Sequence, residues 1–174
     1  MSTCIPDLQY IIATLNLQRL PFEGGWYAQS YKSKDMLCGP SLPERYPGPR
    51  ALGTAIYYLM TAEQDGFSAL HRLRGDEVLH FYLGDPINSL LIYPDGSFRK
   101  FIMGPNIQKG QVLQMVIPAG TWQGHRVCAG KNYALIGSTM TPGYDDEDFE
   151  LGSRSDLCKQ FPLVSNEITS LTRS

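Results

Sequence analysis

Hydrophobic residues near the start of the chain recur at the spacing of a helix. The intervals between them are three, four and seven residues, which places them on one side of an α-helix. They are Ile5, Leu8, Ile11, Ile12 and Leu15. Pro6 and Asp7 suit the first turn of such a helix. We therefore expect an N-terminal helix within residues 1–19, packed against the rest of the chain through this apolar stripe.

From Trp26 onward, the apolar residues fall in short runs that are rich in β-branched and aromatic side chains. Turns that contain Gly, Pro or Asp separate the runs, as at residues 94–97. Strands are expected at about 26–32, 51–61, 66–73, 77–84, 87–93, 98–103, 112–117, 121–127 and 133–141. So many short strands at regular spacing favour an all-β closed barrel or sandwich.

The segments outside these strands differ in composition. Residues 33–50 contain four prolines and are expected to form a long loop within the domain. Residues 142–150 are acidic and aromatic, residues 156–161 are a short helix candidate capped by Ser155, and the last ten residues are expected to fray. We expect one domain over residues 1–174, with a barrel at 20–142 and a C-terminal loop and short helix at 143–174.

Charge and cysteine content narrow the class of protein. The formal net charge is -2, and the Lys and Arg residues are scattered along the sequence. This distribution argues against nucleic-acid binding and against a basic membrane anchor. No apolar run approaches membrane-spanning length, and the chain start lacks the pattern of a secretory signal. Cys4, Cys38, Cys128 and Cys158 form no CxxC pair, so we expect free thiols in a cytoplasmic protein.

Residues 66–84 hold the polar groups that most need an explanation. Two strands joined by a tight bend at residues 74–76 would bring their polar residues together. Side chains alternate along a strand, so His71 and Leu73 share one face of the first strand, and Glu77 and Leu79 share one face of the second. A buried histidine beside a buried carboxylate is costly unless the pair has a role. We therefore expect the functional site here.

These residues resemble the first cupin motif, which is a Gly, a His-x-His, a Glu and a second Gly in fixed order. Gly66, His71, Glu77 and Gly84 match it, and Leu73 stands where the second histidine would be. The second cupin motif, Pro-x-Gly-x-x-His, is similar to residues 118–123, with Gln123 in place of the histidine. The resemblance thus implies a cupin site in which two of the three metal-ligand histidines are missing.

The order of further motifs resembles one branch of the cupin superfamily, an uncharacterised cupin-like family with a Pro-x-Glu-Gly-Gly start. That start matches residues 21–25. Later matches are at residues 53–59, 71–73, 76–77 with His80, 84–86, 118–120 with 122–123, 142–144 and 148–150. The resemblance implies a double-stranded β-helix, or jelly-roll barrel, that forms homodimers and holds a cavity for a small-molecule ligand at one mouth.

Metal-independent acid/base catalysis is the first hypothesis for this cavity. The resemblance to a cupin barrel implies that the side chains of His71, Glu77, Gln123 and His125 all point into the cavity. Glu77 would accept a hydrogen bond from His71 and leave the other ring nitrogen free to take a proton from a substrate. Gln123 and His125 would contact the ligand. Since the resemblance extends to deoxysugar epimerases with a histidine base, this reading is an epimerase or isomerase that acts on a small polar, sugar-like molecule without a cofactor.

A divalent metal is the alternative. His71, Glu77 and His125 form the two-histidine, one-carboxylate set used by iron oxygenases. His125, however, lies two residues beyond the motif position, so its ring should sit roughly 6 to 7 Å farther along the strand. Metal coordination tolerates distance errors of only about 0.2 Å. A metal-dependent oxygenase or isomerase is therefore kept as the second hypothesis.

A ligand-binding or structural protein without turnover is the third hypothesis. It would keep the cavity but need no poised base, and an aromatic-rich sheet forms core and dimer interface more often than a ligand cage. Tyr57 and Arg72 are further candidate ligand-binding residues, with Arg72 suited to an anionic group. Glu23, beside the double glycine, is expected to face solvent. His80 falls on the strand face opposite Glu77, so we expect it to lie between the sheet and a partner subunit, with a hydrogen-bond partner.

Overall fold

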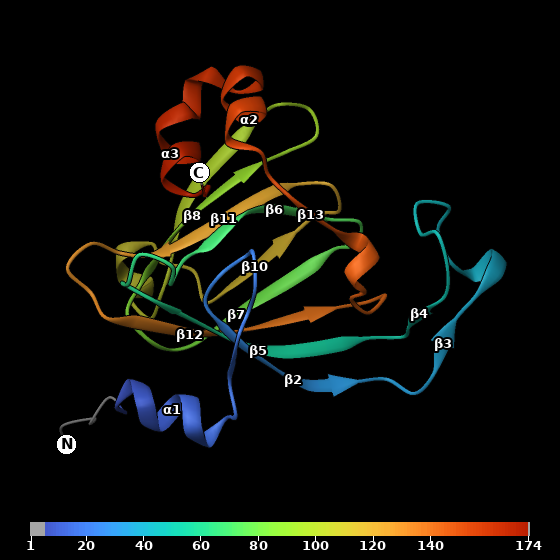
Figure 1. The fold of residues 1–174 in the computed structure, drawn as a ribbon, viewed down its shortest axis with the longest axis horizontal. Coiled ribbons are helices and arrows are strands. Elements are labelled where there is room, and N and C mark those ends of the chain that lie inside the picture. Colours follow the sequence, from blue (N-terminus) through green and yellow to red (C-terminus); the bar gives the residue numbers. More distant parts are fainter. Residues whose placement is uncertain (1–5, 174) are drawn as a thin grey trace.

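Two β-sheets face each other in the computed structural model, which describes residues 6–173 (Figure 1). The six-stranded sheet runs in the order β1 (Gln18–Arg19), β2 (Trp26–Lys32), β5 (Thr54–Thr61), β12 (Tyr133–Met140), β7 (Glu77–Gly84) and β10 (Gln114–Ile117). The five-stranded sheet runs in the order β13 (Phe149–Leu151), β6 (Ser68–Leu73), β11 (Trp122–Val127), β8 (Ile87–Ile92) and β9 (Phe98–Met103). From β5 to β12 the chain alternates between the sheets, apart from the β8–β9 hairpin. This is the predicted all-β jelly roll.

The bend at residues 74–76 carries the chain from one sheet to the other. β6 pairs with β11 and β13, whereas β7 pairs with β12 and β10. The two expected strands and their tight bend are confirmed, but β6 and β7 do not pair with each other, because each strand already has a partner on both sides. Local turn residues predict a tight bend but not the sheet that the next strand joins. His71 and Glu77 consequently approach from opposite sheets, across the interior of the barrel.

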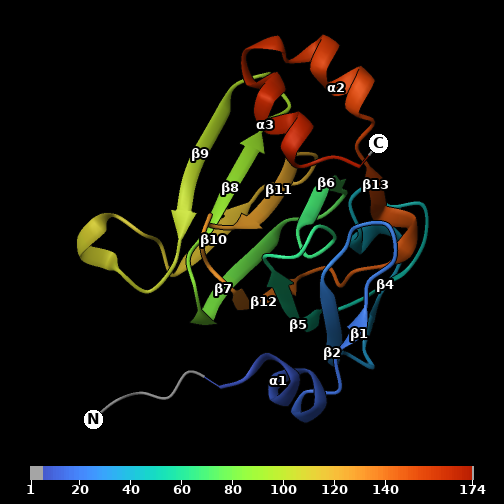
Figure 2. The same ribbon diagram turned by 60° about the vertical axis from the view of Figure 1, so that its left-hand side comes forward.

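Helix α1 (Leu8–Thr14) covers the outer face of the six-stranded sheet, as Figure 2 shows. The Asp7 side chain caps it by accepting hydrogen bonds from the backbone N–H groups of Gln9 (2.9 Å) and Tyr10 (3.4 Å). Ile11 packs with buried residues of the sheet, among them Leu59 and Leu135. The predicted helical stripe is confirmed over these residues, while Ile5 lies outside the described part of the chain.

The C-terminal segment forms two helices, α2 (Arg154–Gln160) and α3 (Ser165–Ser170), which cover the outer face of the five-stranded sheet (Figure 2). Ser153 is the N-cap residue of α2, so the expected cap at Ser155 is wrong. The expected fraying is also wrong, because Ile168 and Leu171 are buried against the sheet. Val164, Ile168 and Leu171 are spaced by four and three residues, a helical stripe that the sequence already contains.

Short elements complete the fold. Within the predicted long loop, β3 (Met36–Leu37) pairs with β4 (Arg50–Ala51). The 3₁₀ turns are Gly39–Ser41, Ile107–Lys109, Asp146–Asp148 and Pro162–Val164. Among residues 6–173, no helix is long and apolar enough to cross a membrane. Cys38, Cys128 and Cys158 are free thiols, and Cys4 lies outside the described residues.

The space between the sheets has one filled end and one hollow end. Apolar side chains from both sheets fill the first, including Met60, Ile87, Met103, Val127 and Ala134. These residues lie near the ends of β5, β9 and β11 and near the starts of β8 and β12. The opposite end, where β5, β7 and β11 begin and β12 ends, encloses a cavity.

Candidate functional site

The cavity has a volume of about 310 Å³ and draws its walls from both sheets. Strands β2, β5, β6, β7, β11 and β12 contribute side chains, and the acidic loop at residues 142–148 closes part of the mouth. His71, Glu77, Gln123 and His125 all line it and are all less than one-tenth exposed. The four side chains that the alternation of strands directs inward thus meet in one place.

Gln123 links the two sheets across this cavity. It lies opposite His71 in the pairing of β11 with β6, and its amide Nε2 donates to Glu77 Oε2 (2.6 Å) on the other sheet. The Ser138 hydroxyl donates to the second oxygen of the same carboxylate. A carboxylate that accepts two hydrogen bonds is held in one orientation. Glu77 is therefore a fixed group on the cavity wall.

His125 extends this hydrogen-bonded chain. Its Nε2 lies 3.1 Å from Gln123 Oε1, and its Nδ1 lies 2.9 Å from the Ser89 hydroxyl. Because the amide N–H of Gln123 points to Glu77, its oxygen must accept from His125, so the hydrogen of this imidazole is on Nε2. Ser89 then donates to Nδ1. Both ring nitrogens of His125 are engaged within the protein.

Burial shifts the protonation of this network in opposite directions. It raises the pKa of Glu77 above its ordinary 4.5, although a nearby His71 and the bonds from Ser138 and Gln123 oppose the shift. It lowers the pKa of His125 to about 3, with a smaller contribution from the charge on His71. His125 is therefore neutral at physiological pH, as its two hydrogen bonds require.

His71 has a different partner from the one expected. Its Nδ1 lies 2.8 Å from the backbone oxygen of Ala69, which can only accept, so Nδ1 carries the hydrogen. The expected hydrogen bond from His71 to Glu77 is wrong, because Gln123 and Ser138 occupy that carboxylate. His71 Nε2 has no hydrogen-bond partner among residues 6–173 and keeps its lone pair. A backbone carbonyl thus fixes the tautomer of His71, a role that the sequence analysis had assigned to Glu77.

Glu23 is a cavity residue that the sequence reading placed in solvent. Its Oε1 accepts a hydrogen bond from Ser68 (2.8 Å) and lies 4.0 Å from His71 Nδ1. The two glycines that follow, Gly24 and Gly25, have positive φ angles of 102° and 68°. A Cβ on Gly24 would lie 2.5 Å from the Phe67 carbonyl oxygen, so only glycine fits this turn. The double glycine was the signal that the position of Glu23 is fixed.

The C-terminal Arg173 holds the same turn from outside. Its guanidinium donates to the backbone oxygens of Phe22 (2.9 Å) and Glu23 (3.0 Å) and pairs with Asp65 (2.5 Å). It also lies over the ring of Phe67, 4.5 Å from the centroid. The last residues of the chain therefore help to position a side chain of the cavity.

Two predicted ligand-binding residues lie outside the cavity. Tyr57 faces the outer groove beneath α1, because alternation along β5 directs its neighbour Tyr58 inward. Arg72 alternates outward in the same way and forms a two-bond ion pair with Glu150 (2.7 and 3.0 Å) over the ring of Trp122. The prediction that Tyr57 and Arg72 bind the ligand is therefore wrong. Tyr58, and not Tyr57, is the tyrosine of β5 that lines the cavity.

His80 lies on the outer face of the six-stranded sheet, opposite Glu77, as expected from alternation. Its Nε2 lies 3.2 Å from the Thr139 hydroxyl, and its Nδ1 lies 3.1 Å from Gln114 Nε2. Both neighbours belong to strands that flank β7. These are the hydrogen-bond partners that the sequence reading required, and the predicted partner subunit stays a prediction.

A family model described as the cupin superfamily (DUF985) matches residues 9–152. This chain belongs to that family. The match spans both sheets and all the cavity residues described above. The predicted cupin membership is confirmed.

Relatives of this cupin include proteins with solved structures. The chain is 28% identical over 102 residues to the uncharacterized protein YML079W of Saccharomyces cerevisiae, a match that covers 57% of this chain and 50% of the yeast protein. The chain thus spans about half the length of that curated relative. A hypothetical protein from Leishmania major is 26% identical with a TM-score of 0.86, covering 97% of this chain and 100% of the other. Protein SO0799 from Shewanella oneidensis is 28% identical with a TM-score of 0.83, covering 97% and 99%. None of these names states an activity.

The candidate metal ligands of this cupin do not fit a metal site. His125 Nε2 carries the hydrogen that Gln123 accepts, so a metal there would break the chain of bonds that ends on Glu77. Within residues 6–173, no three His, Cys, Asp or Glu side chains lie close enough together to hold an ion. The set of His71, Glu77 and His125 is therefore not supported as a ligand set. Metal analysis of the purified protein is the test of the cofactor prediction.

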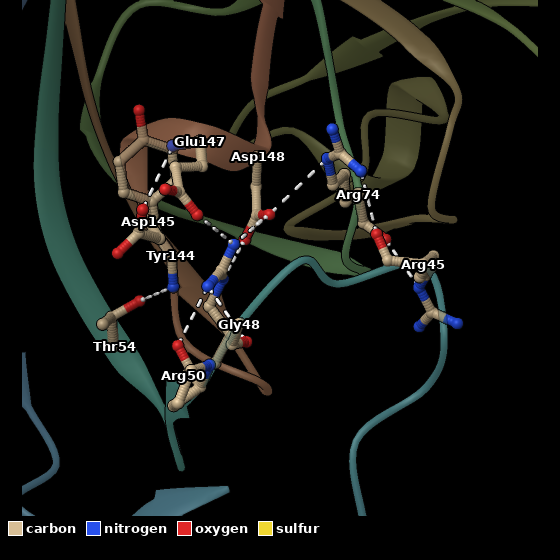
Figure 3. A network of polar contacts seen from close by, with 10 residues as sticks. Arg45, Gly48, Arg50, Thr54, Arg74, Tyr144, Asp145, Glu147 and Asp148 are labelled. Carbon is tan, nitrogen blue, oxygen red and sulfur yellow. Dashed lines mark hydrogen bonds and ion pairs between the residues drawn. The ribbon is translucent and has the colours of Figure 1, made fainter. Parts of the chain in front are cut away.

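The acidic loop of this cupin is held at the cavity mouth by a buried ion pair (Figure 3). Arg50 donates to both oxygens of Asp148 (2.7 and 2.8 Å), and both side chains are almost fully buried. The carboxylate raises the pKa of Arg50 through this bond, so the guanidinium stays charged. Nearer the start of the loop, the Tyr144 N–H donates to the Thr54 hydroxyl (3.0 Å). These bonds place Tyr144 and its acidic neighbours in the cavity wall.

Proposed function

We propose that the cavity binds a small, sugar-like polar molecule and that His71 acts on it as a general base. One observation carries the proposal. His71 is only 4% exposed, its Nδ1 hydrogen is held by a backbone carbonyl, and its Nε2 lone pair has no partner in the described part of the chain. A buried imidazole that lines a cavity with a free basic nitrogen is the arrangement that proton transfer requires.

The reaction that fits this arrangement is removal of a proton from a carbon beside a carbonyl group. His71 Nε2 would take the proton, and the electron pair of the broken C–H bond would move toward the carbonyl oxygen to form an enolate. Return of the proton to the other face gives an epimer. Its return to the former carbonyl carbon, with the hydroxyl hydrogen passing from one oxygen of the enediolate to the other, gives an isomer. The carboxylates of Glu23 and Glu77 would stabilise the imidazolium formed in between.

The size of the cavity supports a small ligand. Pockets for small molecules usually measure about 300 to 1,000 Å³, and this one lies at the lower limit with about 310 Å³. A monosaccharide or a molecule of similar size suits this space better than a sugar nucleotide. Gln123 would contact the ligand through its second N–H, which the bond to Glu77 leaves free.

Deuterium exchange tests the base. D-fructose and D-glucose are incubated with the protein in D₂O, and deuterium at the carbon beside the carbonyl is followed by NMR. The wild-type protein is expected to speed up this exchange, and His71→Asn to slow it by about 10²- to 10⁴-fold. His80→Asn, which removes a half-buried imidazole from the outer face, is the control and should keep the wild-type rate. Exchange no faster than in buffer, or equal rates for His71→Asn and wild type, would leave ligand binding without turnover as the function.

A further inference from the structure

Several hydroxyl groups of the cavity wall donate their hydrogens to other groups of the protein. The Tyr58 hydroxyl donates to the backbone oxygen of Gly24 (2.8 Å), and the Ser68 hydroxyl donates to Glu23 Oε1 (2.8 Å). Each oxygen then has only lone pairs left for a ligand. The hydroxyl oxygens of Tyr58 and Ser68 therefore offer hydrogen-bond acceptors to a ligand.

The groups around Glu77 follow the same rule. Ser138 and Gln123 each donate to the carboxylate of Glu77, and His125 donates to Gln123 Oε1. His71 donates from Nδ1 to a backbone carbonyl. What remains of these groups for a ligand is the lone pair of His71 Nε2, the unused lone pairs of the oxygens and one N–H of Gln123.

Two buried donors are left in the lining, beside the part-buried hydroxyls of Tyr27 and Tyr144, the exposed amide of Gln29 and one exposed cation. The donors are the second N–H of Gln123 and the hydroxyl of Thr54, which accepts from the Tyr144 N–H but has no acceptor of its own among residues 6–173. Lys32, exposed at the mouth, is the single Lys or Arg of the lining. A ligand must therefore supply most of the hydrogen-bond donors itself, because buried acceptors without donors are costly.

The charges of the lining also favour a ligand that brings hydrogen-bond donors. Four carboxylates line the cavity, those of Glu23, Glu77, Asp145 and Asp146. The Glu23 side chain is only 15% exposed, and within the described residues no Lys or Arg side chain pairs with its carboxylate. A half-buried carboxylate without a cationic partner favours a ligand that brings a positive charge.

We infer that the ligand is a small amine-bearing polyol, of the chemical class of the amino sugars. Its ammonium group would bind Glu23 beside His71, and its hydroxyl groups would donate to the acceptors of the wall. This inference rests on the proposed function, since it concerns the same cavity. It excludes phosphorylated sugars and sugar nucleotides, because the buried wall has no Lys or Arg to bind a phosphate group.

Three probes with the same sugar ring test the inference on the full chain. Binding of D-glucosamine, D-glucose and D-glucose 6-phosphate is measured by isothermal titration calorimetry at mildly acidic pH, where the amine is protonated. D-glucosamine is expected to bind about tenfold or more tightly than D-glucose, the strength of a hydrogen bond to a charged group. D-glucose 6-phosphate is expected to bind more weakly than both.

Variants of single carboxylates locate the preference. Glu23→Gln is expected to remove the preference for D-glucosamine over D-glucose. Asp146→Asn, at the exposed mouth, should weaken D-glucosamine binding severalfold and provides a second variant if Glu23→Gln folds poorly. Glu150→Gln is the control, because Glu150 is exposed and paired with Arg72 outside the cavity; it should keep the full preference.

Each result separates this inference from the function on which it rests. Equal or tighter binding of D-glucose or D-glucose 6-phosphate would overturn the inference of an amine and leave sugar binding in place. A preference for D-glucosamine that survives both Glu23→Gln and Asp146→Asn would also overturn it. If none of the three sugars binds at millimolar concentration, the inference and the proposed sugar-like ligand both fall.

Discussion

The buried His125 should make the protein unstable toward acid. Its pKa is about 3 in the folded protein because burial penalises the charged ring, whereas the ordinary value is 6.5. Below pH 6.5 the unfolded chain therefore binds a proton that the folded chain refuses. Stability from this group is fully present above pH 6.5 and falls as the pH drops toward 3, at up to about 1.4 kcal/mol per pH unit. Between pH 6 and pH 4, the loss amounts to about 2.5 kcal/mol.

The variant His125→Asn removes this proton-binding group while keeping a polar side chain beside Gln123 and Ser89. Its free energy of unfolding, measured by urea denaturation from pH 7 to pH 4, is expected to be lower than that of the wild type at pH 7. The difference should shrink by about 2.5 kcal/mol between pH 6 and pH 4, since only the wild type loses the His125 contribution. His80→Asn controls for the loss of a histidine as such and should keep the wild-type pH dependence. Parallel pH curves for His125→Asn and wild type would refute the assignment of a neutral, buried His125.

Three further predictions concern neighbouring groups. Glu77→Gln should make the loss of stability between pH 7 and pH 4.5 steeper than in the wild type, because it removes a carboxyl whose raised pKa adds stability as the pH falls and so offsets part of the His125 loss; an unchanged pH profile of urea denaturation would contradict this. Arg50→Met should lower the free energy of unfolding by about 3 to 5 kcal/mol by leaving Asp148 buried and unpaired, while Arg50→Met with Asp148→Leu should recover most of the loss; equal losses would argue against coupling. Arg173→Met should weaken D-glucosamine binding severalfold by loosening the Glu23 turn, with fold retention checked by circular dichroism.

Much of the architecture could be predicted because alternation and turn residues are local signals. The bounds of β2 (Trp26–Lys32) and β9 (Phe98–Met103) match the expected ones, as do the strand faces of Glu77 and His80. The pairing of strands is not local. The bend at residues 74–76 has the chemistry of a hairpin turn, yet the partners of β6 and β7 lie far away in the sequence.

The candidate site shows the same division. Alternation was enough to place His71, Glu77, Gln123 and His125 on inward faces, but it could not say which atoms bond. The donor to Glu77 is Gln123 and not His71, because the register of β11 against β6 and the separation of the two sheets decide which groups meet. Alternation alone could not settle whether Tyr57 points inward, and only the structure shows that β5 turns Tyr58 inward in its place.

The positions where cupin motifs carry metal-ligand histidines have acquired another purpose in this chain. Leu73 adds an apolar side chain to the cavity wall, and Gln123 uses its amide to join Glu77 to His125. A neutral amide with one donor side and one acceptor side suits this task, since it can link a carboxylate to an imidazole without adding charge. The network thereby ties up Glu77 and His125 and leaves His71 Nε2 and Glu23 as the groups with free binding capacity. Chemistry in this cavity is thus expected at His71 and Glu23.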